Sequence, residues 1–324
     1  MSDSRVALTA NYTVGSVGYR DWWAPILERL AGPALDALTI PSGAPRILDL
    51  GCGTGLASRR LTARLPGDAR LVGGDLVPAM LALARQQAPD IPVVRFDATQ
   101  LPFPDRRFDR VVCTFALHHI REQRRVLGEV FRVLAPGGQL MVITWGSEGQ
   151  EGCPAETAWD NLLLEALDDV TPPEPVPGWH TEINTPSAFE SMLTSLGFRC
   201  DSVTASTGAY DYTPETLAGV RLGFGVGRRR FLALTPAKQQ RFEAKARRLL
   251  ARLPASNFAC RPGLVTALAA KPMDGAALEE GTAAGTPSGD YRTTCPNCGA
   301  VMHDRGCKTR CPECHFFTDC SDPW

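Results

Sequence analysis

The sequence predicts a doubly wound α/β fold with a mostly parallel sheet. Between Ile47 and Trp145, short apolar runs alternate with segments of helical spacing, which is the pattern of consecutive strand–helix units. A glycine-rich segment, residues 49–55, lies between the first apolar run and the first helical segment. Acidic residues end the second apolar run, at Asp75, and occur in the third, at Asp97. Because ligands bind at the carboxyl ends of strands in this fold class, the same pattern predicts a binding site.

The expected elements follow one another in a regular order. Periods of two and of 3.6 residues separate strands from helices along the chain. The predicted strands cover residues 46–48, 71–75, 93–98, 108–113, 139–145, 198–206 and 264–270. The predicted helices cover residues 22–38, 56–65, 123–134, 156–170, 186–196 and 236–253.

The glycine-rich segment has the form D-x-G-x-G-x-G, from Asp49 to Gly55. Its glycines allow a tight turn and leave the backbone uncovered by Cβ atoms, so that a ligand can rest on it. The helix that follows presents free backbone N–H groups at its N-terminus. A dinucleotide fingerprint would require a glycine where Leu56 stands. Asp75 lies 20 residues after Gly55, where a carboxylate can accept hydrogen bonds from both hydroxyls of a ribose.

This ordered set of motifs resembles the class I S-adenosylmethionine-dependent methyltransferases, in the branch that includes the ubiquinone- and menaquinone-pathway enzymes. The resemblance is close over residues 45–146 and loose to about residue 272. It implies a seven-stranded, Rossmann-like sheet that an antiparallel hairpin completes. It also implies S-adenosylmethionine as cofactor and O-, C- or N-methylation of a small-molecule acceptor.

The resemblance further implies a donor site built from the glycine loop and the following strand ends. Asp49 would orient the ammonium group of the donor, Asp75 would bind its ribose, and Asp97 would accept from the adenine amine. The alternatives are an ordinary turn, a solvated strand-end acid and, for Asp97, a turn cap. The implied donor-binding residues are Asp49, Gly51, Cys52, Gly53, Gly55, Asp75, Leu76, Asp97, Ala98 and Phe115.

Two adjacent histidines, His118 and His119, follow the fourth predicted strand. An imidazole titrates near neutral pH, so either could remove a proton from the acceptor as a general base. The structural alternative is that one of them caps the next helix or fills the core. His180 is a further candidate base. The basic run 228–230 is interpreted as a solvated helix face, or as a site for an anionic acceptor.

The C-terminal region carries two C-x-x-C motifs with twelve residues between them. Four thiolates at this spacing can enclose Zn²⁺ tetrahedrally, and a segment of about thirty residues cannot build an adequate core without such a staple. The predicted zinc ligands are Cys295, Cys298, Cys311 and Cys314. Cys307 and Cys320 remain unassigned, and a labile zinc or a redox switch that uses them is the alternative.

These motifs divide the chain into three parts. We expect a methyltransferase domain over 1–272, with insertions at 146–185 and 214–253 on the substrate side. A linker rich in small residues should cover 273–290, and a zinc ribbon should cover 291–324. The aromatic-rich segment before the first strand either folds over the cofactor site or packs a helix onto the core.

Composition limits the classes of partner. The 324 residues carry a formal net charge of −1, so no global basic field attracts nucleic acid. An Asn-Pro-Pro-Tyr run, common in nucleic-acid methyltransferases, does not occur in the sequence. The alternative function is an RNA or protein methyltransferase that grips its substrate through the zinc ribbon, which could also dock a protein. Apolar runs stay well short of the ~20 residues of a membrane helix, and the N-terminus lacks a signal core, so a cytoplasmic location is expected.

Overall fold

The computed structural model describes residues 3–149, 152–167 and 181–273, together with the backbone of three short strands near the C-terminus. These three are β10 (His303–Asp304), β11 (Lys308–Arg310) and β12 (Phe317–Asp319), and they pair in an antiparallel sheet. The four predicted zinc ligands, the expected linker from residue 274 onward and His180 lie outside the described residues.

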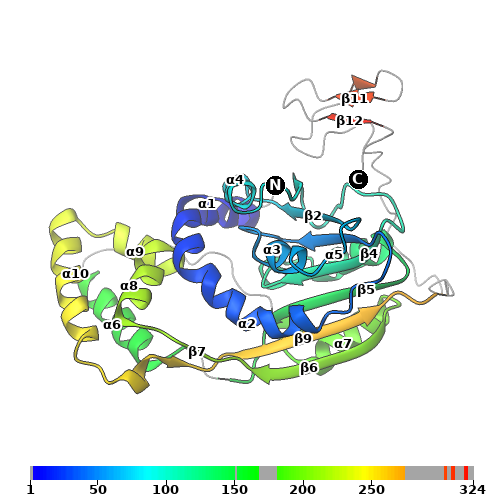
Figure 1. Cartoon of the computed structure of the whole chain (residues 1–324). Coiled ribbons are helices and arrows are strands. Elements are labelled where there is room, and N and C mark those ends of the chain that lie inside the picture. The colour runs from blue at the N-terminus through cyan, green and yellow to red at the C-terminus, as the bar shows by residue number, and fades with distance from the viewer. Residues whose placement is uncertain are drawn as a thin grey trace.

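A seven-stranded sheet forms the centre of the molecule (Figure 1). Its strand order is β3-β2-β1-β4-β5-β9-β6, with parallel pairing from β3 to β5 and antiparallel pairing of β9 with both of its neighbours. This mixed sheet confirms the predicted seven-stranded, mostly parallel α/β fold. The strands are β1 (Arg46–Leu50), β2 (Arg70–Asp75), β3 (Val93–Arg95), β4 (Phe108–Thr114), β5 (Leu134–Trp145), β6 (Arg199–Thr207) and β9 (Gly263–Ala270).

Helices cover both faces of the sheet. Successive residues of a strand point to opposite faces and pack in two different hydrophobic cores. Ile47 and Ile143 belong to one core, whereas their neighbours Leu48 and Val142 belong to the other. Burial on both faces explains why these strands are nearly continuous apolar runs rather than alternating ones. The covering helices are α2 (Ala24–Ala37), α3 (Leu56–Thr62), α4 (Pro78–Gln87), α5 (Gln123–Val133) and α7 (Pro186–Ser195).

The N-terminal region contains more helix than the sequence predicted. A long helix α1 (Asp3–Gly18) leads through a π-helical turn, Tyr19–Trp23, into α2. The backbone of Gly18 lies against Gly223, because a Cβ atom on Gly18 would be 2.2 Å from the carbonyl oxygen of Gly223. Gly223 ends another helix, α8 (Pro214–Gly223), so α1 is fixed by a segment about 200 residues away. Such a contact leaves little trace in the local sequence pattern.

Four helices form a layer at one end of the molecule (Figure 1). They are α6 (Pro154–Ala166), α8, α9 (Gly225–Leu232) and α10 (Pro236–Leu250). Trp159 of α6 is fully buried and packs edge-on against Phe242 of α10, with 5.1 Å between ring centroids. Two short strands, β7 (Tyr210–Asp211) and β8 (Ala259–Cys260), pair at the base of this helical layer. The layer coincides with the expected insertions, and its role on the substrate side stays a prediction.

Among the helices that the structure describes, each is too short or too polar to cross a membrane.

Candidate functional site

A pocket lies at the carboxyl ends of the central strands, where the strand order reverses between β1 and β4. Seven of the ten predicted donor residues line it, together with one of the two candidate bases. These lining residues are Gly51, Gly53, Asp75, Leu76, Asp97, Ala98, Phe115 and His119. Asp49, Cys52, Gly55 and His118 are not on the pocket wall. Four segments that are separate in the sequence therefore meet at one site.

The glycine loop needs its glycines for two different reasons. Gly51, Gly53 and Gly55 have φ angles of 71°, 55° and 82°, in the left-handed region that favours glycine. A Cβ atom on Gly51 would also lie 2.3 Å from the Cβ atom of Ala116, so a side chain has no room there. Around Gly53, by contrast, a Cβ atom would meet only ordinary contacts, such as Met80 at 3.6 Å. The loop thus presents open backbone to the pocket at Gly53.

Asp75 holds this loop in place. Its Oδ2 accepts a hydrogen bond from the Gly53 N–H at 2.9 Å, and its Oδ1 accepts from the Val77 N–H at 2.9 Å. Burial raises the pKa of Asp75, although both backbone hydrogen bonds favour the ionised form. Asp75 also lines the pocket, and a carboxylate oxygen can accept more than one hydrogen bond, so the group can still bind a ribose hydroxyl.

Asp49 lies beneath the loop and is completely buried. Its Oδ2 accepts from the N–H and the hydroxyl of Ser58, at 2.9 and 2.6 Å. Among the described residues, none donates a hydrogen bond to its Oδ1. Burial raises the pKa of Asp49 to about 6. A buried acceptor without a donor costs free energy.

Asp97 is held by its own turn and by the N-terminal helix. Its Oδ1 accepts from the N–H and the hydroxyl of Thr99, at 2.9 and 2.8 Å, which is the turn cap that the sequence left open as an alternative. Its Oδ2 forms an ion pair with Arg5 of α1 at 2.5 Å. Arg5 also pairs with Glu122 at 3.1 Å. Helix α1 is therefore tied to the edge of the pocket that should receive the adenine.

Aromatic side chains from α1 and the following turn close the pocket. Tyr12 shares a hydrogen bond with His119, with 2.7 Å between the hydroxyl oxygen and Nε2. Tyr12 and Tyr19 both line the pocket and both pack against Phe224, each with 5.1 Å between ring centroids. Burial raises the pKa of Tyr12 well above its usual value, so its hydroxyl stays protonated. The aromatic residues before the first strand had suggested that this segment could fold over the site. No feature of the sequence had indicated a role for Arg5.

The two histidines have different surroundings. His118 is 4 % exposed, and its Nδ1 lies 3.4 Å from the hydroxyl oxygen of Thr144 in the interior. His119 lines the pocket and contacts Tyr12. His118 is therefore part of the protein interior, whereas His119 is part of the pocket wall.

The basic run 228–230 lies on α9 in the helical layer. Arg228 donates to the carbonyl oxygen of Leu222 at 3.1 Å. Burial raises the pKa of Asp160 overall, and the nearby charges of Arg221 and Arg230 oppose that rise. Both arginines therefore have partners within the layer, and an anionic acceptor at this run stays a prediction.

Comparison with known proteins identifies the domain that carries the pocket. Residues 48–142 match the family described as "Methyltransferase domain". By sequence, this segment is similar to methyltransferase domains. A demethylmenaquinone methyltransferase of Thermus thermophilus is 43 % identical over 110 residues, which are 33 % of this chain and 50 % of the relative. A ubiquinone/menaquinone biosynthesis C-methyltransferase of Yersinia enterocolitica is 32 % identical over 131 residues, which are 39 % of this chain and 51 % of the relative.

The chain spans about half the length of these curated relatives. A fold similarity reaches further along the chain. A chain in a solved Haloferax volcanii complex of the Trm112 methyltransferase activator with a methyltransferase has a TM-score of 0.51 at 17 % identity. The alignment covers 83 % of this chain and 98 % of that chain. It shows that the Rossmann-like methyltransferase fold extends beyond the segment that matches by sequence.

Proposed function

We propose that this protein transfers a methyl group from S-adenosylmethionine to a small-molecule acceptor, by O-, C- or N-methylation. The observation that carries the proposal is the single pocket in which the glycine loop, Asp75 and the Asp97–Ala98 turn meet His119. In this proposal the glycine loop contacts the methionine part of the donor, Asp75 binds its ribose, and the Asp97–Ala98 turn contacts its adenine. The family match over residues 48–142 and the named activities of the relatives support the same reaction.

Bound S-adenosylmethionine would supply a methyl group activated by a positive sulfonium. The protein then has to hold the acceptor in line with that group, and such positioning contributes much of the rate in displacement reactions. The Gly51–Gly55 loop, Asp75 and Asp49 would fix the donor. Phe115, at a positive φ of 51° and packed on Trp145 with 4.6 Å between ring centroids, would form the wall next to the acceptor.

His119 is the proposed general base. His119 lines the pocket, and the hydrogen bond between its Nε2 and the Tyr12 hydroxyl holds the ring in position. Acceptors with a hydroxyl, an acidic carbon or a protonated amine have a proton to lose, and His119 can take it. Tyr12 is a positioning residue in this scheme.

The acceptor itself should contact the helical layer. The match to the methyltransferase family ends at residue 142, before α6 begins at Pro154, so the relatives' quinone substrates do not transfer directly to this chain. Near-zero net charge and the small-molecule enzymes among the relatives favour a small acceptor over RNA or protein.

We also propose that Cys295, Cys298, Cys311 and Cys314 bind one structural zinc ion. The support is the spacing of the two C-x-x-C motifs and the antiparallel backbone of β10, β11 and β12 between and beyond them. Cys311 follows directly after β11, the central strand of that sheet. Pairs of cysteines at this spacing are typical zinc ligands.

The donor site is tested by replacing Asp75 with alanine. Loss of the ribose acceptor removes hydrogen bonds to a charged group, each worth about 1.5–3 kcal/mol, so binding of S-adenosylmethionine should weaken ~10-fold or more. Calorimetry with the donor, and transfer of a labelled methyl group to a metabolite mixture, measure the two expected losses. Asp90→Ala, in the turn before β3 and outside the pocket, is the matched control. A wild-type protein that binds NAD but not S-adenosylmethionine would refute the proposal.

A further inference from the structure

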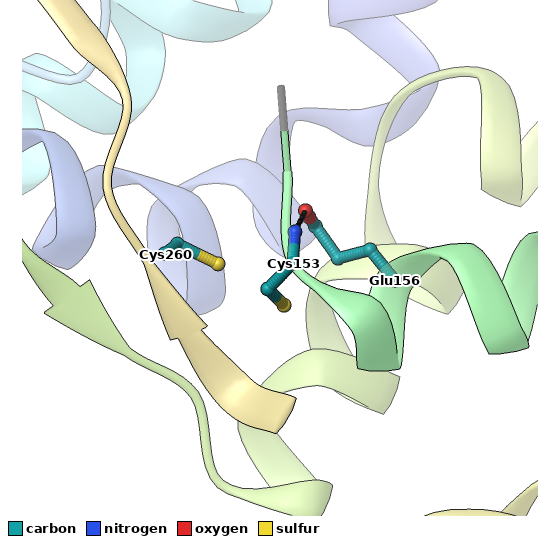
Figure 2. Close-up of side chains that lie close together, drawn as sticks. All are labelled: Cys153, Glu156 and Cys260. Carbon is teal, nitrogen blue, oxygen red and sulfur yellow. Dashed lines mark hydrogen bonds between the residues drawn. The ribbon is translucent and has the colours of Figure 1, made fainter. Parts of the chain in front are cut away.

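Two cysteines that are far apart in the sequence meet at the base of the helical layer (Figure 2). Cys153 precedes the first turn of α6, and Cys260 ends β8. Their sulfur atoms and a carboxylate oxygen of Glu156 all lie within 4.8 Å of one another. The cysteines are buried, with 2 % and 1 % of their surface exposed. Neither residue lines the donor pocket, so the proposed function leaves this pair unused.

The two thiols are electrostatically different. Their mutual hydrogen bond lowers the pKa of Cys153 to about 7 and raises that of Cys260. Backbone N–H groups at the N-terminus of α6 also favour the Cys153 thiolate, because its sulfur and the Glu156 side chain form a reciprocal capping box. The contact thus favours the thiolate at Cys153 and the thiol at Cys260. This is the asymmetry of an attacking and a resolving cysteine.

The carboxylate of Glu156 already has partners on both oxygens. Its Oε2 accepts from the Cys153 N–H at 3.0 Å. Its Oε1 accepts from the Tyr212 hydroxyl at 3.1 Å and pairs with Arg221 at 3.2 Å. Figure 2 shows the carboxylate turned toward the Cys153 backbone nitrogen, away from the Cys153 sulfur. Two thiols and one occupied carboxylate fall short of the four ligands of a structural zinc site, so the geometry favours thiol chemistry over metal binding.

We propose that Cys153 and Cys260 form a reversible disulfide when the protein meets a peroxide. The Cys153 thiolate attacks one peroxide oxygen and the O–O bond breaks. The sulfur becomes a sulfenic acid, and the departing hydroxide takes up the proton that Cys153 released on ionisation, which forms the first water. The Cys260 sulfur then attacks the Cys153 sulfur, the S–O bond breaks, and the departing hydroxide takes the Cys260 proton to form the second water. The two sulfurs lose two electrons in total, and the peroxide gains them. A dithiol reductant reverses the reaction by thiol–disulfide exchange.

The disulfide would lock the helical layer to the sheet. Cys153 lies where the chain enters α6 from β5, and Cys260 lies where it leaves the layer and enters β9. A bond between these points closes a loop of more than a hundred residues. Long closed loops restrict the unfolded chain most, so oxidation should raise the melting temperature by roughly 5 °C. The proposal stands independently of the methyl-transfer reaction.

The test uses the full-length, reduced protein treated with hydrogen peroxide, alkylated and mapped by mass spectrometry without reduction. We expect a linked peptide pair that contains Cys153 and Cys260, with a mass lower by two hydrogens, and its disappearance after dithiothreitol. The melting temperature should rise with the link and return after reduction. Peptide mapping separates this link from any that involve the C-terminal cysteines.

Variants define the outcome further. Cys153→Ser and Cys260→Ser should each abolish the linked pair and the thermal shift, whereas Cys200→Ser, at a partly exposed cysteine elsewhere, should retain both. The wild-type measurement needs no variant, so poor folding of a variant leaves the test intact. Wild-type protein in which both thiols remain alkylatable after peroxide treatment overturns the proposal. So does zinc that is present in the wild type and lost in Cys153→Ser, since that result would make the cluster a metal site.

Discussion

His118 and His119 are adjacent in the chain, yet their side chains lie in different surroundings. Their ring centroids are 4.0 Å apart, but one ring contacts Thr144 in the interior and the other contacts Tyr12 at the pocket. Both residues belong to the 3-10 turn at Leu117–His119, in which His118 is buried. From the sequence, either residue could be the general base. The geometry favours a packing role for His118 and a chemical role for His119.

We therefore expect opposite effects from the two alanine substitutions. His119→Ala should lower turnover by ~10²–10⁴-fold, the usual contribution of a general base, with little change in donor affinity. His118→Ala should mainly lower the melting temperature, because it removes a buried side chain. Turnover, calorimetry with the donor and thermal melting of both variants measure these effects. Unchanged turnover in His119→Ala would exclude it as the base.

At the scale of elements, α1 forms one wall of the pocket. Arg5 bridges from this helix to Asp97 and Glu122, and Tyr12 reaches His119. The side chains of Arg5 and Asp97 are 24 % and 29 % exposed, so solvent screens their ion pair. A pair of this kind contributes about 0–1 kcal/mol.

Arg5→Ala should loosen α1 without unfolding the protein. If the Arg5–Asp97 pair has to break before the donor enters, its removal should increase the association rate by up to ~5-fold, the equivalent of about 1 kcal/mol. Stopped-flow measurement of donor binding checks this, with Arg20→Ala as a control because Arg20 pairs only locally with Asp21. A slower association, together with weaker donor affinity, would instead make Arg5 a direct contact of the donor.

At the scale of the whole molecule, the C-terminal segment should be a separate metal-dependent unit. Metal binding supplies the folding free energy of such modules, about 10–16 kcal/mol at neutral pH. Each chain should therefore carry one zinc ion, and a chelator should unfold the tail while the methyltransferase domain keeps its melting temperature. A chain that ends at Pro272 should remain folded and bind the donor.

Metal analysis of variants checks the ligand assignment. Cys295→Ser should lose the zinc, whereas Cys320→Ser, outside the two C-x-x-C motifs, should retain it. Zinc content that is the same in the wild type and in Cys295→Ser would contradict the assignment. Donor binding without methyl transfer by the chain that ends at Pro272 would show that the tail takes part in substrate capture.

The sequence by itself determined the sheet and much of the wall of the pocket. The glycine loop, Asp75 and Asp97 could be predicted because each depends on a strand end and on the turn that follows it, which are local properties. Parallel strands bring those ends to one edge, so local predictions combine into a site. Helix ends were less predictable: the helix expected to reach residue 170 ends at Ala166, where no single residue marks the boundary.

Only the tertiary structure decided which side chains complete the pocket and which cysteines meet. Tyr12 and His119 are 107 positions apart in the sequence, and Cys153 and Cys260 are separated by the same number. Such contacts depend on how α1, α6 and β8 pack, and packing is set by the shapes of distant surfaces such as the backbone contact of Gly18 with Gly223. The local sequence pattern predicts whether a segment is a helix or a strand and where it turns. It does not predict which distant element that segment will pack against.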